Sequence, residues 1–202
     1  MKLIFATGNP DKMDEIREIM DDLGFEVSSM KEEGIESDPD ENGESFEANA
    51  GIKARAVHDI CVERGIEAIV LADDSGLEID CLNKEPGVYS ARYLGRDTSY
   101  EEKNLNLIAR VDKTGDLERT ARFVCAVAAV FPDGREEIVR GTIEGVIAKT
   151  PSGNHGFGYD PIFYVPEFGC TTADLSNEAK NKVSHRGNAL RMIKNILLEE
   201  LH

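Results

Sequence analysis

The chain has 202 residues, of which 41% are hydrophobic and 31% are charged, and its formal net charge is −16. This length is enough to bury a full core as one domain or two packed lobes, and the composition is ordinary for a globular protein. The negative charge excludes non-specific binding to nucleic acids or anionic membranes, and no segment approaches the roughly 18 apolar residues of a membrane span.

The N-terminal third of the chain alternates between strand-like and helical patterns. Lys2–Ala6 is short and apolar and is predicted to be a buried strand. It is too short to be a signal peptide, so we expect a cytoplasmic protein. A helix is predicted near Asp11–Leu23 and a short strand at Phe25–Ser29, after which an acidic loop with glycine and proline runs from Glu32 to Glu44.

The middle of the chain continues this alternation. The pattern predicts a helix from about Ser45 to Arg64 and a strand at Ala68–Ala72. The spacing of Thr98 and Glu101 is that of a capping box, so a helix is expected to begin there and to end near Val111.

The second half of the chain predicts a long hairpin and a final helix. Phe123–Phe131 is apolar on both faces, which is typical of a central strand, and Glu137–Ala148 follows a turn as its antiparallel partner. Ser184 is predicted to cap the last helix. The core face of this helix is expected to consist of Leu190, Ile193, Leu197 and Leu201. We therefore predict an α/β fold with a mixed sheet, without a linker that would separate residues 1–202 into independent domains.

The four cysteines are widely spaced and contain no C-x-x-C pair, so neither a disulfide framework nor a zinc site is expected. We interpret them as small buried hydrophobic residues in a reducing compartment. They are Cys61, Cys81, Cys125 and Cys170.

The segment after the first strand has the character of an anion site. It reads Thr7, Gly8, Asn9, Pro10, Asp11, Lys12 and begins a helix, where backbone N–H groups are available to an anion. Lys12 opposes the helix dipole, which a bound anion would explain. The alternative, a plain turn with Asn9 as the helix cap, is equally compatible with these residues.

Two carboxylates, Asp73 and Asp74, follow the buried strand Ile69–Leu71. Because α/β proteins place their sites at the carboxyl ends of strands, one of the two is expected to face a cleft, hold Mg²⁺ and orient a water. The alternative is a turn before Gly76 in which the aspartates have only a local structural role. Glu41, Glu44 and Glu47 lie in or just after the acidic loop, and one of them could join such a metal.

The C-terminal quarter combines an aromatic, glycine-rich loop with cations. The loop is Gly156-Phe157-Gly158-Tyr159-Asp160-Pro161, and Lys180, His185 and Arg186 follow it. An aromatic face suits a flat base, and Lys and Arg suit phosphate or carbonyl oxygens. This combination indicates a nucleotide ligand.

Taken together, the motifs T-G-N-x-x-K, A-D-D-S-G-L, P-G-x-Y-S-A-R-Y, G-F-G-Y-D-P and S-H-R resemble those of the inosine/xanthosine triphosphate pyrophosphatase family. The resemblance covers nearly the whole chain. It implies a single domain in which a long mixed sheet with helices on both sides forms two lobes around a nucleotide cleft. It also implies a homodimer that hydrolyses ITP, dITP and XTP to monophosphate and pyrophosphate with Mg²⁺.

The resemblance implies a role for each motif residue. Thr7 to Lys12 and Lys53 would hold the triphosphate, Asp74 would bind the metal and activate water, and Glu41 would be the second metal ligand. Ser75 would touch the substrate. The base and sugar would contact Phe157, Gly158, Tyr159, Asp160, Lys180, His185 and Arg186.

Two other functions are compatible with parts of the pattern. One is a Maf-like pyrophosphatase acting on dTTP or UTP, against which Lys180 and the Ser184–Arg186 motif count. The other is a nucleotide-binding sensor without hydrolysis, against which the Asp73-Asp74 pair counts, because carboxylates beside a triphosphate do not help simple binding.

Overall fold

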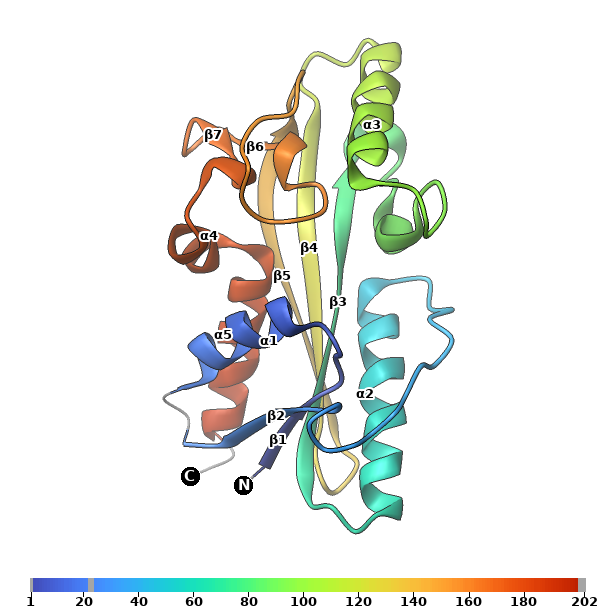
Figure 1. Ribbon diagram of the computed structural model, residues 1–202, viewed down its shortest axis with the longest axis vertical. Coiled ribbons are helices and arrows are strands. Elements are labelled where there is room, and N and C mark those ends of the chain that lie inside the picture. Colours follow the sequence, from blue (N-terminus) through green and yellow to red (C-terminus); the bar gives the residue numbers. More distant parts are fainter. Residues whose placement is uncertain (1, 22–23, 200–202) are drawn as a thin grey trace. The chain divides into compact units, whose positions relative to one another are not determined.

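The computed structural model describes residues 2–21 and 24–199 and has an α/β fold with a mixed sheet, as the sequence predicts (Figure 1). Within the described residues the sheet has seven strands in the order β2-β1-β3-β4-β5-β6-β7. The strands are β1 (Lys2–Phe5), β2 (Glu26–Ser29), β3 (Ala68–Ile79), β4 (Thr120–Val130), β5 (Glu136–Ile147), β6 (Phe163–Val165) and β7 (Cys170–Thr171).

The directions of the strands make the sheet mixed. Strand β1 pairs in parallel with both β2 and β3, whereas β6 pairs antiparallel with β5 and β7. The helices are α1 (Pro10–Met20), α2 (Phe46–Glu63), α3 (Tyr100–Thr114), α4 (Asn177–Val183) and α5 (His185–Glu199). Short 3₁₀ turns occur at η2 (Asp80–Leu82), η3 (Gly87–Arg92), η4 (Asp160–Ile162) and η5 (Thr172–Asp174). No helix in the described ranges is both long and apolar enough to cross a membrane.

The contacts divide the chain into two compact units. Unit 1 comprises residues 1–74, 125–141 and 186–202, and unit 2 comprises residues 75–124 and 142–185. Strands β3, β4 and β5 each contribute segments to both units. The prediction of one domain without a separable linker stays a prediction.

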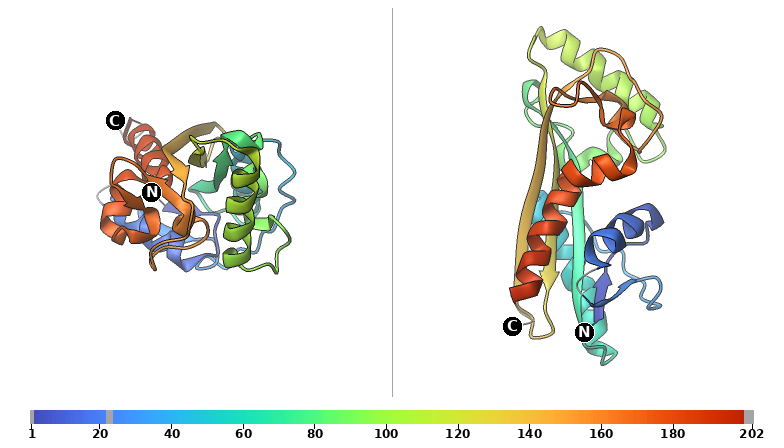
Figure 2. Two further views of the ribbon diagram at one scale, coloured as in Figure 1. Left: turned by 90° about the horizontal axis from the view of Figure 1, so that it is seen from above. Right: turned by 90° about the vertical axis from the view of Figure 1, so that its left-hand side faces the viewer.

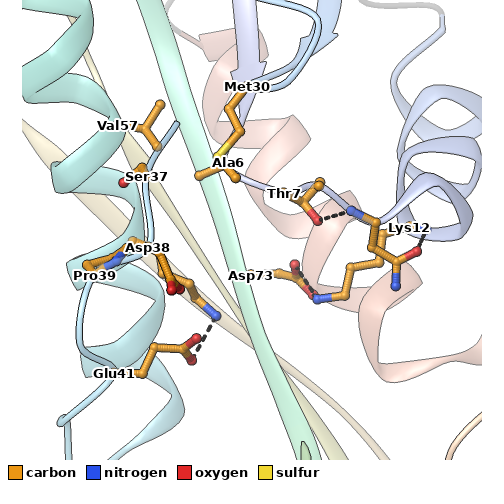
Figure 3. A pocket seen from close by; sticks show the side chains of 13 residues that line it. Ala6, Thr7, Lys12, Met30, Ser37, Asp38, Pro39, Glu41, Val57 and Asp73 are labelled. Atoms are coloured by element: carbon orange, nitrogen blue, oxygen red, sulfur yellow. Dashed lines mark hydrogen bonds and ion pairs between the residues drawn. The ribbon is translucent and has the colours of Figure 1, made fainter. Parts of the chain in front are cut away.

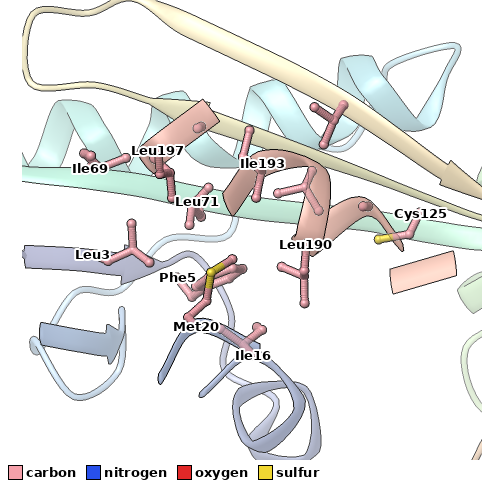
Figure 4. Close-up of a cluster of buried hydrophobic side chains, with 14 of the residues drawn as sticks. Leu3, Phe5, Ile16, Met20, Ile69, Leu71, Cys125, Leu190, Ile193 and Leu197 are labelled. Carbon is pink, nitrogen blue, oxygen red and sulfur yellow. The ribbon is translucent and has the colours of Figure 1, made fainter. Parts of the chain in front are cut away.

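In unit 1, helices cover both faces of the sheet (Figures 1 and 2). Helices α1 and α5 lie on one face, where their apolar residues pack with β1, β3 and β4 (Figure 4). Helix α2 lies on the other face and is capped by the Ser45 side chain, which accepts the N–H of Ala48. Leu190, Ile193 and Leu197 of α5 are buried in this core as predicted. The predicted fourth residue, Leu201, and the predicted end of the first helix, Leu23, lie outside the described residues.

In unit 2, α3 packs with the strands through a second apolar cluster that includes Leu107, Val111, Phe123 and Phe163. The N-cap of α3 is Ser99, whose hydroxyl accepts the N–H of Glu102, so the predicted capping box was placed one residue too early. The reason is that Thr98 uses its hydroxyl to donate to the carbonyl of Leu94 instead.

Strand β3 also departs from the sequence-based prediction. The strand was expected to end at Ala72, with Asp73 and Asp74 in a following turn, but it continues to Ile79. The Asp-Asp-Ser-Gly sequence resembles a turn locally, whereas pairing with neighbouring strands keeps the backbone extended. Asp73 and Asp74 therefore lie within the strand, and the turn interpretation is wrong.

The cysteines follow the prediction in part. All four are free thiols, and Cys61 and Cys125 are buried. Burial raises the pKa of Cys125 to about 12, so this thiol stays protonated and inert near neutral pH. Cys81 and Cys170 are only partly buried, which corrects the expectation of four buried residues.

Candidate active site

The loop after β1 begins where β1 stops pairing with β3. The N–H of Ala6 donates to the carbonyl of Leu71 (2.7 Å), and the chain then turns away from the sheet. The hydroxyl of Thr7 accepts the N–H of Asn9 (3.2 Å), and the Asn9 side chain accepts the N–H of Lys12 (3.4 Å). Asn9 thus caps α1, with Pro10 at the first helical position, where a missing N–H costs nothing.

A pocket of about 310 Å³ opens beside this loop within unit 1 (Figure 3). Most of its lining comes from four segments that are distant in sequence, and Met30 after β2 completes it. The four segments are the loop after β1 with Lys12, the acidic loop with Ser37–Pro39 and Glu41, Lys53 and Val57 of α2, and Asp73 of β3. Because β1 ends at Phe5 while β3 continues, Asp73 is left uncovered by the shorter strand.

Asp73 is a buried anion held by two cations. Both oxygens of its carboxylate accept hydrogen bonds from the Lys12 ammonium (2.9 Å each), and one of them lies 3.3 Å from Nε of Arg186. Burial alone would raise the pKa of Asp73, but Lys12 and Arg186 hold it well below the usual range. In this structure the anion opposite Lys12 is therefore an internal carboxylate, and a bound anion is not needed to explain a cation at the start of α1.

Asp74 faces a different helix, because successive residues of a strand point to opposite faces. One oxygen of its carboxylate lies 3.4 Å from the Lys53 ammonium, and the other accepts the side-chain amide of Asn49 (3.1 Å). Burial raises the pKa of Asp74 above its usual value despite the attraction of Lys53. A carboxyl group with a raised pKa is the stronger base once it is ionised.

Lys53 links Asp74 to the acidic loop. Its ammonium also donates to Glu41 (3.2 Å), and the nearby carboxylates raise the pKa of Lys53 even though burial opposes this. Glu41 lines the pocket, whereas Glu44 is exposed and does not. The described residues contain no group of three or more His, Cys, Asp or Glu side chains arranged to hold a metal ion.

The aromatic loop lies in unit 2 and is organised around Asp160. This carboxylate, 2% exposed, accepts the Lys180 ammonium (2.7 Å), the N–H of Phe157 (2.8 Å) and the hydroxyl of Thr172 (2.8 Å). Gly156 has a φ of +75°, and a Cβ there would lie 2.2 Å from the Asp160 carboxylate, so only glycine fits. Asp160 therefore fixes both the loop and Lys180.

The two aromatic residues of the loop point to different environments. The Phe157 ring is 46% exposed and has the Lys180 ammonium 5.0 Å from its centroid, a cation–π contact. The Tyr159 ring is 4% exposed, its hydroxyl donates to the carbonyl of Ser90 (2.6 Å), and it meets the Tyr100 ring edge-on. The aromatic face that this loop leaves accessible is that of Phe157.

The remaining predicted site residues are placed as follows. Ser75 is partly exposed in β3, where unit 2 begins, and His185 stacks on Phe123 with centroids 4.9 Å apart. Gly158 accepts the side-chain amide of Asn104 through its carbonyl (3.1 Å). Asp11 lies in α1, but its side chain is outside the described part of the structure. Roles for all these residues stay predictions.

Sequence reasoning missed two residues that contact predicted site carboxylates. Asn49 contacts Asp74, and Thr172 contacts Asp160. The sequence did contain a signal for Asn49. Asparagine is a weak helix former, yet it occurs in the apolar part of α2, four residues before Lys53 and therefore on the same face of the helix. Thr172 carried none, because nothing in its neighbourhood indicates that it turns towards Asp160.

Comparisons with known proteins agree with the motif pattern. The model of the Ham1 family matches residues 3–196. A "dITP/XTP pyrophosphatase" of Bacillus subtilis is 44% identical, covering 96% of each chain, and one of Clostridium perfringens is 42% identical, covering 97% of each. The solved structure of a HAM1 protein from Coxiella burnetii has a TM-score of 0.88 at 36% identity, covering 98% of this chain and 99% of that one. That of the Staphylococcus aureus Ham1 protein has a TM-score of 0.87 at 38% identity, covering 99% and 100%.

Proposed function

The chain belongs to the Ham1 family, and on this premise we propose that it hydrolyses the deaminated purine nucleotides dITP, ITP and XTP to nucleoside monophosphate and pyrophosphate. The proposal draws on relatives named dITP/XTP pyrophosphatase, which are 41–46% identical over at least 96% of this chain. The observation that carries it is the unit 1 pocket, in which Lys12 and Lys53 line the same cavity as Asp73 and Glu41, with Asp74 alongside.

The polyphosphate is assigned to the loop after β1. The start of α1 has the positive end of the helix dipole, which favours a phosphate oxygen. The ammonium groups of Lys12 and Lys53 line the adjacent pocket, and each has three hydrogen atoms to donate. Their carboxylate partners hold both cations in place before the substrate arrives, so little side-chain entropy is lost on binding.

Asp74 is assigned as the base that accepts a proton from the attacking water. The carboxylate is ionised when it acts, and its raised pKa makes it a better proton acceptor than an ordinary aspartate. Lys53 and Asn49 each contact one of its oxygens, which fixes the plane of the carboxylate. A fixed plane favours one position for the water and therefore one direction of attack.

The carboxylates also fit a divalent cation, for which we propose Mg²⁺. Glu41 and Asp74 both contact one cation, the Lys53 ammonium, so two oxygen donors of the preferred kind meet at one place. Mg²⁺ is typically bound by one or two carboxylates, and substrate phosphates and waters complete its coordination. The bound metal would neutralise polyphosphate charge and polarise the phosphorus–oxygen bonds.

The base is assigned to the aromatic loop and to the residues that follow it. Phe157 offers an exposed ring for stacking, and Lys180 is held beside it by Asp160. Hypoxanthine and xanthine carry a carbonyl at C6, which donors such as Arg186 or the His185 backbone would satisfy. The amino group of adenine would leave a buried donor unpaired, at a cost of roughly 1–3 kcal/mol.

We also propose a homodimer, which the family resemblance implies, and a cytoplasmic location. Membership of the Ham1 family removes the reason to keep the Maf-like alternative. A sensor without hydrolysis is disfavoured by the Asp74 carboxylate beside a pocket suited to polyphosphate.

The first test is release of pyrophosphate with Mg²⁺ from dITP, ITP, XTP, ATP, GTP, dTTP and UTP. Selective turnover of the inosine and xanthosine nucleotides is expected. A preference for dTTP or UTP would contradict the purine assignment, and tight nucleotide binding without any release would indicate a sensor. Chelation of the metal with EDTA is expected to stop the release, and added Mg²⁺ to restore it.

A further inference from the structure

A completely buried asparagine lies next to the proposed catalytic aspartate. Asn49, in the first turns of α2, has an exposed fraction of 0%. Asparagine is a weak helix former, and a buried amide costs free energy unless both its ends are hydrogen-bonded. A position inside a helix would be more stable with alanine, so the contacts of this side chain need an explanation.

Both ends of the Asn49 amide are hydrogen-bonded, one to the proposed catalytic base and the other to the acidic loop. Its nitrogen donates to Asp74 (3.1 Å), and its oxygen accepts the backbone N–H of Gly43 (2.8 Å). These partners determine which end is the oxygen, because an N–H can only donate and an ionised carboxylate can only accept.

Asn49 and Lys53 form a matched pair on one face of α2. They are four residues apart, and each contacts a different oxygen of Asp74. Each also contacts the acidic loop, Asn49 at Gly43 and Lys53 at Glu41. One helix face therefore holds the carboxylate and the loop together through four contacts.

The approach of the loop to Asn49 is close. A Cβ at Gly43 would lie 2.7 Å from the Asn49 side-chain oxygen and 2.7 Å from Cβ of Ala48, so no larger residue fits without a shift. Gly43 is two residues from Glu41, and the contact therefore limits where the Glu41 carboxylate can lie.

We propose that Asn49 is a positioning residue for hydrolysis, which holds the Asp74 carboxylate in one orientation and ties it to the loop that carries Glu41. It does not touch the substrate. This role rests on the proposed function, because it acts through the water-activating carboxylate.

The test compares two variants of Asn49 by their kcat and KM for dITP with Mg²⁺. N49A removes both contacts and is expected to lower kcat on the order of 10- to 100-fold, the range for losing a hydrogen bond to a charged group. KM is expected to change by less than about threefold, because the phosphate loop is intact. N49D keeps the size and the acceptor for Gly43 but cannot donate to Asp74, so its kcat is expected to fall at least as far as that of N49A.

S45A is the matched control, because it weakens the same end of α2 without touching Asp74. Ser45 accepts the N–H of Ala48, and its loss costs about 1 kcal/mol of stability. Thermal midpoints of all three variants are measured alongside the kinetics, and S45A is expected to keep the kcat of the unmodified enzyme.

Three results would overturn or redirect the inference. If N49D keeps normal kcat while N49A does not, Asn49 only holds the loop, and the role toward Asp74 is wrong. If kcat falls in proportion to the loss of stability in S45A as well as in N49A, the effect of N49A comes from lost stability, and Asn49 is a structural residue. If N49A fails to fold, the kcat of N49D, whose side chain has the same size as asparagine, tests the inference. An unmodified enzyme inert toward all nucleotides would instead overturn the proposed function.

Discussion

The two regions with predicted site residues organise their charges in opposite ways. In unit 1, Glu41 and Asp74 share the Lys53 ammonium, the buried Asp73 is paired with Lys12, and both cations line a pocket. In unit 2, Asp160 is almost fully buried and bonded to three donors, and only the Phe157 ring beside it is exposed.

This difference indicates that the charged residues of the two units have different roles. The pairs that Lys53 makes with Glu41 and Asp74 are shared and partly exposed, so they can exchange partners with a charged ligand at little cost. A buried, saturated ion pair cannot, because separating it leaves an uncompensated charge in a low dielectric. We therefore expect charge changes in unit 1 to affect catalysis, and those in unit 2 to affect stability and the position of the aromatic loop.

The largest effect is expected for D74N. Removing the base should lower kcat on the order of 10²- to 10⁴-fold, the usual contribution of general-base catalysis. Nucleotide affinity should change little, because Lys12 and the loop after β1 are unaltered. Pre-steady-state binding and steady-state pyrophosphate release separate the two quantities. A D74N variant with near-normal kcat would show that another group activates the water.

D160A should affect stability instead of chemistry. It leaves the Lys180 ammonium buried without its carboxylate and frees the Phe157 loop, so the free energy of unfolding should fall by about 3–5 kcal/mol. Urea denaturation of D160A and D74N measures the contrast directly. Equal stability of the two variants would contradict the proposed division between the units.

F157A should raise KM for dITP with little change in kcat. Loss of the stacking face is worth roughly 1–3 kcal/mol, which corresponds to about 5- to 150-fold in KM. F157L keeps the bulk of the side chain without its aromatic face and serves as the control. If F157L binds dITP as tightly as the unmodified enzyme, hydrophobic contact and not stacking is the contribution of Phe157.

Y159F should have the smallest effect, because Tyr159 is buried away from the exposed face. Deleting its hydroxyl removes the hydrogen bond to the carbonyl of Ser90 and should cost about 1 kcal/mol of stability. Values of kcat and KM for dITP are expected to match those of the unmodified enzyme. A selective rise of KM in Y159F would assign Tyr159 to base recognition alongside Phe157.

Local patterns were sufficient for most of the secondary structure. The apolar run Phe123–Phe131 predicts a buried central strand, and Thr120–Val130 is that strand. The helix predicted from about Ser45 to Arg64 is present as Phe46–Glu63, and Ser45 is its cap. These signals succeed because capping and burial depend on residues that are close in sequence.

The extent of β3 could not be predicted in this way. Asp73, Asp74 and Gly76 are all disfavoured in strands, and only pairing with neighbouring strands keeps this segment extended. For the same reason the partners of the two carboxylates could not be predicted from the sequence. Lys12 is 61 residues from Asp73 along the chain, and Arg186 is 113 residues away.

The sequence by itself determined the family, the α/β class and which charged residues belong to the motifs, because these depend on residue identity and order. The tertiary structure alone decided which cation meets which carboxylate. Asp73 faces α1 and α5 whereas Asp74 faces α2, since β3 remains extended and successive side chains point to opposite faces of the sheet. The contact of Asn49 with Asp74 arises in the same way, from packing of a helix against a strand and not from any local pattern.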